Sequence, residues 1–106
     1  WPSATRPMPE KAEPPGMLVL PAVLTLGQAT ACRAMLLQTL RAQNWPEVVV
    51  DATALQQFDS SALAVLLDCR RACLASGRAF RVHGLSPRLR QLAGVYGVAD
   101  LLAETP

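Results

Sequence analysis

The sequence predicts an α/β fold in which a small mixed, mostly parallel sheet packs with helices. Short apolar runs alternate along the chain with longer segments whose apolar residues recur every three or four positions. Glycine and proline punctuate the boundaries between these segments. Strands that alternate with helices favour a parallel sheet with right-handed crossovers.

Size and composition suit one compact domain. Of the 106 residues, 51% are hydrophobic, 17% charged and 5% aromatic, so we expect an aliphatic core. A chain of this length buries roughly two-thirds of its unfolded surface without disulfides. The net charge of +2 is too small to indicate a nucleic-acid partner. No apolar run nears the roughly 18 residues of a membrane span, and no secretory signal is visible, which favours a cytoplasmic location.

The first part of the chain divides into a tail and two short strands. Residues 1–15 hold five of the nine prolines and show no apolar periodicity, so we expect a flexible tail followed by a domain over residues 16–106. Residues 17–26, MLVLPAVLTL, predict two strands broken near Pro21, because proline cannot donate a ladder hydrogen bond.

A helix is expected next, over residues 31–43. In this interpretation Gly27 ends the preceding strand and Thr30 supplies the N-cap. Asn44 and Pro46 then stop the helix. Its inward face is predicted from apolar residues at four-residue steps, namely Cys32, Leu36 and Leu40, with Leu37 beside them.

The middle of the chain predicts a buried strand and a second helix. Residues 47–51, EVVVD, place three valines between charged residues, which is typical of a strand covered on both faces. The helix is expected to run from about Ser61 to Ser76, with Gly77 capping its end. Its apolar face comprises Ala62, Val65, Leu66, Cys69 and Cys73.

A last strand and helix follow. Residues 79–85 alternate apolar and polar side chains, which predicts a strand. Ser86 is expected to cap a helix that has Pro87 at its first position and stops at Gly97. The inward stripe of that helix comprises Leu89, Leu92, Ala93 and Tyr96.

The three cysteines, Cys32, Cys69 and Cys73, are interpreted as buried structural thiols. An odd number without a secretion signal argues against a disulfide framework. The only histidine, His83, lies well outside the turn that holds Cys69 and Cys73, so a metal site would lack ligands. We therefore expect no metal and no other cofactor.

The junction between the valine strand and the second helix carries a polar cluster. It comprises Gln56, Gln57, Phe58, Asp59, Ser60 and Ser61. Aspartate and serine accept hydrogen bonds from the free N–H groups of a first helical turn, so capping explains one of these residues. The carboxyl ends of parallel strands are also where open α/β sheets meet ligands and partners. Capping and a binding or modification role therefore both stay open.

A serine-hydrolase site is the weaker interpretation of this cluster. A nucleophilic Ser60 needs a base within hydrogen-bond reach, His83 is the only histidine, and no nucleophile-elbow motif is present. A regulatory phosphate on Ser60 suits the position better. The helix dipole tolerates that charge, whereas a partner packed over it would be repelled. We expect no catalytic residues and no enzymatic activity.

Residues 48–67, VVVDATALQQFDSSALAVLL, resemble the signature of STAS domains, the family of anti-sigma-factor antagonists. In that signature an apolar strand, an aspartate and a short loop lead to Asp-Ser-Ser or Asp-Thr-Gly at the start of a helix. The resemblance covers about residues 17–102. It implies the STAS, or SpoIIAA-like, fold.

Two branches of the family compete. Residues 84–102, GLSPRLRQLAGVYGVADLL, are similar to the end of MlaB-type STAS subunits of phospholipid-transport ABC complexes. Ala62 stands where the antagonists usually carry a glycine, which is a departure from their form. The resemblance therefore favours the MlaB type. The alternative is an anti-sigma-factor antagonist regulated by phosphorylation at Ser60.

The MlaB resemblance implies a non-enzymatic accessory subunit in the cytoplasm, peripheral to the inner membrane. Its partner would be an MlaF-like ATPase, in a complex with permease and substrate-binding subunits that maintains outer-membrane lipid asymmetry. Ser60 would lie at the centre of the contact, Asp59 would fix the loop and Ser61 would cap the helix. The rim would consist of Gln56, Gln57 and Phe58, with an exposed Phe58 as an apolar anchor. No nucleic acid and no membrane span of its own are expected.

Overall fold

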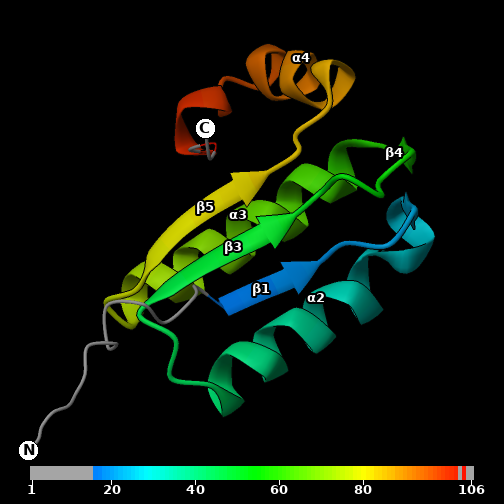
Figure 1. Ribbon diagram of the computed structural model, residues 1–106. Helices are drawn as coiled ribbons and strands as arrows, with labels where there is room; N and C mark the ends of the chain where they lie inside the picture. The colour runs from blue at the N-terminus through cyan, green and yellow to red at the C-terminus, as the bar shows by residue number, and fades with distance from the viewer. Residues whose placement is uncertain (1–15, 103, 105–106) are drawn as a thin grey trace, which may run out of the picture.

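The computed structural model describes residues 16–102 and 104. Strands and helices alternate as expected (Figure 1). The proposed tail over residues 1–15 lies outside the described residues. In chain order the elements are β1 (Gly16–Val19), β2 (Val23–Leu24), α2 (Leu26–Ala42), β3 (Glu47–Asp51), β4 (Gln57–Phe58), α3 (Ser60–Ala75), β5 (Ala79–His83), α4 (Pro87–Val95) and the 3-10 helix η2 (Ala99–Leu101).

The main sheet has the strand order β1-β3-β5, and both of its pairings are parallel. β2 and β4 form a separate two-residue parallel pair, in which Leu24 lies opposite Phe58. The predicted parallel sheet is therefore confirmed. β4 was expected to be loop, and two residues are too few for a period-two pattern to reveal a strand. The loops that follow β1, β3 and β5 meet at one end of the sheet, because the three strands run in the same direction.

The core lies between the sheet and helices α2 and α3. Every second residue of the three strands packs in one core cluster with the buried faces of both helices. These strand residues are Leu18, Val48, Val50, Phe80 and Val82. The predicted inward stripe of α2 is buried, as is the predicted face of α3. Val49 points to the other face, where its register neighbours are Met17 and Arg81. It is only 5% exposed. All three valines of β3 are therefore buried, as expected for a strand covered on both faces of the sheet, although the core cluster lies on one face only.

The start of α2 differs from the prediction. The helix begins at Leu26, so Gly27 and Thr30 are helical residues and neither ends a strand nor supplies the cap. Thr25 is the N-cap, and its backbone N–H donates to Gln28 Oε1 at 3.0 Å. Thr25-x-x-Gln28 has the spacing of a capping box, whose two residues satisfy free backbone N–H groups at the start of a helix. The helix therefore starts five residues earlier than it would with an N-cap at Thr30.

The other helix boundaries agree with the prediction to within a residue or two. Ser86 Oγ accepts from the Leu89 N–H at 3.1 Å, with Pro87 at the first helical position. The glycines that follow the C-terminal ends of α3 and α4 have positive φ, +75° at Gly77 and +72° at Gly97. After Gly77 the Arg78 N–H reaches the Cys73 carbonyl at 2.8 Å, and an equivalent bond follows Gly97. This is the Schellman pattern, which only a residue tolerant of left-handed backbone completes without strain.

All three cysteines are buried and unpaired, as expected. Burial raises the pKa of the Cys69 thiol to about 12, and it raises the pKa of Cys32 and Cys73 as well. The thiols therefore act as small apolar core residues between α2 and α3. Among the described residues no helix is both long and apolar enough to cross a bilayer.

Candidate functional site

Asp59 joins the starts of two helices. It is the N-cap of α3, and its Oδ1 accepts from the Ser61 N–H at 2.8 Å. Its Oδ2 accepts from the Leu26 N–H at 3.1 Å, at the first residue of α2. These hydrogen bonds, led by that from Ser61, lower the pKa of the Asp59 carboxyl. Ser61 was expected to cap α3. It is the second helical residue instead, because the longer reach and charge of Asp59 serve both helix ends.

Ser60 is the first residue of α3, and its position is set by the Asp59 cap before it. The side chain is exposed. It borders two hollows, one of about 480 Å³ toward α4 and one of about 300 Å³ along α3. Tyr96 borders both hollows with it. The polar cluster therefore opens onto a concave surface, with Ser60 where the two hollows meet.

Of the three rim residues predicted from the sequence, Gln57 and Phe58 form strand β4, which leads to Asp59, and Gln56 directly precedes it. The backbone N–H groups of Gln56 and Gln57 both donate to the Ala22 carbonyl, at 2.8 and 3.0 Å. Both glutamine side chains are exposed, as a rim requires. Phe58 was expected to be exposed, but it is half-buried and packs against the core. Its ring also lies under Arg88, whose guanidinium carbon is 5.0 Å from the ring centroid.

Helix α4 supplies the wall of the larger hollow, and sequence reasoning missed this contribution. Arg88, Gln91, Val95 and Tyr96 border that hollow opposite Asp59 and Ser60. Tyr96 was expected in the buried stripe of α4, yet it is 58% exposed, and Val95 is 77% exposed. The apolar periodicity of the sequence continues past the end of the helix, because α4 stops at Val95 and Tyr96 is its C-cap. Exposed apolar residues in a hollow are a signal for a partner.

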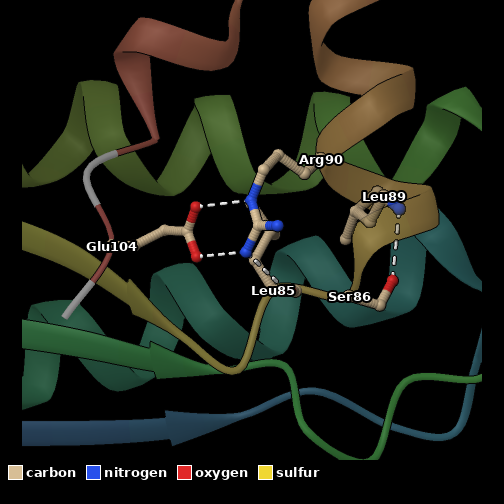
Figure 2. A network of polar contacts seen from close by, with 5 residues as sticks. All are labelled: Leu85, Ser86, Leu89, Arg90 and Glu104. Atoms are coloured by element: carbon tan, nitrogen blue, oxygen red, sulfur yellow. Dashed lines mark hydrogen bonds and ion pairs between the residues drawn. The ribbon is translucent and has the colours of Figure 1, made fainter. Parts of the chain in front are cut away.

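An ion pair between Arg90 and Glu104, called here the clasp, connects α4 to the end of the described chain (Figure 2). Arg90 donates to both carboxylate oxygens of Glu104 at 2.8 Å, and its Nη2 also donates to the Leu85 carbonyl at 3.2 Å. Glu104 also forms a parallel bridge with Val82 of β5. The bidentate pair raises the pKa of Arg90 and lowers that of Glu104. The clasp therefore holds the wall of the larger hollow at the edge of the sheet.

The residues of the hydrolase alternative are not brought together around the hollows. His83 lies at the end of β5 in register with Asp51, and it borders neither hollow next to Ser60. Asp51 is engaged by Thr53, whose N–H and hydroxyl donate to Oδ1 at 3.0 and 2.7 Å. These bonds lower the pKa of Asp51. Within residues 16–102 and 104, His, Cys, Asp and Glu form no group of three that could hold a metal ion.

Comparison with known proteins identifies the family and the fold. The family model described as "Mlab, STAS domain" matches residues 9–103. A solved structure of the anti-sigma factor antagonist SpoIIAA in its unphosphorylated form is similar with a TM-score of 0.67 and 16% identity, covering 86% of this chain and 81% of that one. A sulfate transporter family protein from Wolinella succinogenes is similar with a TM-score of 0.68 and 14% identity, covering 93% and 83%. No relative was found among curated protein sequences.

Proposed function

The chain belongs to the family of STAS domains described as Mlab, and on that premise we propose that it is an accessory subunit of a phospholipid-transport ABC complex. STAS domains are generally binding and regulatory domains rather than enzymes. The subunit would bind the MlaF-like cytoplasmic ATPase of a transporter that also contains permease and substrate-binding subunits. It would lie in the cytoplasm against the inner membrane through that complex.

The observation that carries this proposal is the exposed Ser60 between two hollows with apolar walls. A docking surface needs a central patch from which water can be expelled and a polar rim around it. Val95, Tyr96 and the half-buried Phe58 offer the apolar patch around Ser60. Gln56 and Gln57, which are exposed and precede Phe58 in the chain, would provide the polar rim.

The proposal is tested by placing a negative charge at its centre. Ser60→Asp adds a carboxylate at the first position of α3, where the helix dipole tolerates it, so the thermal midpoint should hold. Binding to the ATPase should fall because that charge would be desolvated against the partner. Asn44→Asp adds the same charge to an exposed residue beyond the other end of α2, and it is the matched control.

The experiment is a tagged pull-down from detergent-solubilised native membranes, read by mass spectrometry. Wild type and Asn44→Asp should recover an ABC ATPase together with its permease, and Ser60→Asp should not. Equal recovery of the ATPase by Ser60→Asp and Asn44→Asp would place the contact elsewhere. Absence of any ABC ATPase from the wild-type sample would refute the transporter assignment.

A second candidate function is that of an anti-sigma-factor antagonist switched at Ser60. The similarity to the SpoIIAA structure and the exposed serine directly after a capping aspartate favour it. A phosphate there would add a charge of about −1.5 to −2 at pH 7 and repel a bound regulator. Incubation with the host's serine kinases and ATP should then add the mass of one phosphate at Ser60, and an unmodified Ser60 under conditions of kinase activity would eliminate this candidate.

A further inference from the structure

We propose that the hollow between the start of α3 and helix α4 binds a partner segment that carries a carboxylate beside apolar side chains, and that Arg88 selects it. This inference rests on the proposed docking function and adds the chemistry of the partner. The hollow, called here the α3–α4 groove, is bordered by Phe58, Asp59, Ser60, Arg88, Gln91, Leu92, Val95 and Tyr96.

The walls of the groove require an apolar component in the partner. On one side of the groove, Val95 is 77% exposed and Tyr96 is 58% exposed. Leu92 and Phe58 are half-buried and lie between the groove and the core. The groove measures about 480 Å³, which is enough for two or three large side chains. An entirely polar ligand would leave these walls in contact with water.

The charge in the groove requires an anionic component. Among the described residues, Arg33, Arg71, Arg81 and Arg90 pair with carboxylates. Arg88 has no carboxylate partner there, and its contact is the Phe58 ring. The acidic residue in the groove, Asp59, is engaged by the N–H groups of Ser61 and Leu26. Asp59 stays ionised, but its oxygens are already engaged, so the N–H donors of Arg88 are the charged groups left to bind a partner.

The position of Arg88 over the Phe58 ring suits it to a carboxylate in particular. A guanidinium attracted to an aromatic ring by a cation–π contact keeps its five N–H donors for other partners. Those donors match the two oxygens of a carboxylate in a bidentate pair. The Phe58 ring restricts the side chain before binding, so less conformational entropy is lost when the pair forms.

The geometry favours a protein segment over an anionic lipid surface. Attachment to a membrane surface draws on a cluster of several basic residues, each contributing a small amount. The α3–α4 groove has one arginine among apolar and polar neighbours. One bidentate charge pair beside a concave apolar surface is the arrangement that recognises a short amphipathic peptide segment.

The test uses random 16-residue peptides displayed on phage and selected on the full chain at low salt. The best binders are then synthesised in acidic form and in amide form, with Asp and Glu replaced by Asn and Gln. Fluorescence polarisation measures their affinity for wild type, Arg88→Gln, Arg88→Lys and Arg41→Gln. Arg41 is exposed in the last turn of α2, roughly 22 Å along the helix from Leu26, so its variant controls for the lost charge.

We expect the selected peptides to carry a carboxylate beside aromatic or aliphatic residues. Arg88→Gln and the amide peptides should each weaken binding roughly tenfold, and their combination should add little, because both remove the same pair. Arg88→Lys should recover only part of the affinity, because lysine is a point charge without the planar fork. Arg41→Gln should bind as wild type does.

Selected peptides without acidic residues, or equal binding to Arg88→Gln and wild type, would overturn the inference. The inference would also be overturned if the selection yields no peptide binders while the wild type binds anionic phosphatidylglycerol vesicles in an Arg88-dependent manner. Failure of the transporter assignment would look different. In that case acidic peptides would bind through Arg88 while pull-downs recover no ABC ATPase.

Discussion

Gly84 connects β5 to α4, and substituting it should reveal how tightly the wall of the groove is joined to the sheet. Its φ is +76°, and a Cβ added there would overlap Thr53 Cγ2 and lie 3.1 Å from the Thr53 backbone nitrogen. The Thr53 side chain cannot rotate away freely, because its hydroxyl donates to Asp51 Oδ1 at 2.7 Å. Gly77 has nearly the same φ, +75°, and a Cβ there would meet nothing within 4 Å.

The two glycines therefore form a matched pair. Gly77→Ala should lower the free energy of unfolding by about 1 kcal/mol, the cost of left-handed backbone for a residue with a Cβ. Gly84→Ala should incur that cost plus roughly 1–3 kcal/mol for the forced overlap with Thr53. Thr53→Ser removes Cγ2 but keeps the hydroxyl, so it should restore part of the stability of Gly84→Ala.

Urea denaturation followed by circular dichroism measures these differences. For a chain of this size, 1 kcal/mol corresponds to a shift of about 4–8 °C in the thermal midpoint, which provides an independent check. Equal losses for Gly84→Ala and Gly77→Ala would refute the packing argument. So would a Thr53→Ser substitution that restores no stability to Gly84→Ala.

Further predictions concern the core, the carboxylates and the thiols. Leu89 of α4 is fully buried, so Leu89→Ala should lower the unfolding free energy by about 2–5 kcal/mol in urea denaturation; a loss below 1 kcal/mol would mean that α4 is not anchored in the core. Asp51 has a lowered pKa in the folded state, so its stabilising contribution is present above the ordinary Asp pKa and is lost as the pH falls through the folded value. Asp51→Asn should therefore flatten the acid limb of a stability-versus-pH curve, and an unchanged acid limb would contradict this. The three buried thiols should react with a thiol reagent only after unfolding, and fast labelling of the native chain would show that α2 and α3 separate readily.

Local signals in the sequence account for most of the fold. Ser86-Pro87, Gly77 and Gly97 mark helix ends whose backbone hydrogen bonds are those that their residue types favour. The EVVVD run gives β3 with both boundaries correct. The predicted start of α2 is five residues too late, because the capping box of Thr25 and Gln28 starts the helix before Gly27 and the helix tolerates that glycine.

The site was only partly predictable, because its geometry depends on contacts between distant parts of the chain. The polar cluster around Ser60 is visible in the sequence, and the structure places it at an exposed helix start. The link from Asp59 to Leu26 spans 33 residues, and no local pattern indicates it. The contact of Arg88 with Phe58 likewise joins residues 30 positions apart, and no local pattern indicates it. Sequence periodicity assigned Tyr96 to the core, whereas the structure places it on the groove.

The most direct test of the central claim is site-specific photo-crosslinking in native host cells. A photoreactive amino acid is introduced at Ser60 and, as the control, at Val19, which is 57% exposed on the sheet. We predict that position 60 crosslinks to an ABC ATPase and that position 19 does not. A crosslink to the ATPase from position 19 alone, or from position 60 to a serine kinase or sigma-factor regulator, would contradict the account.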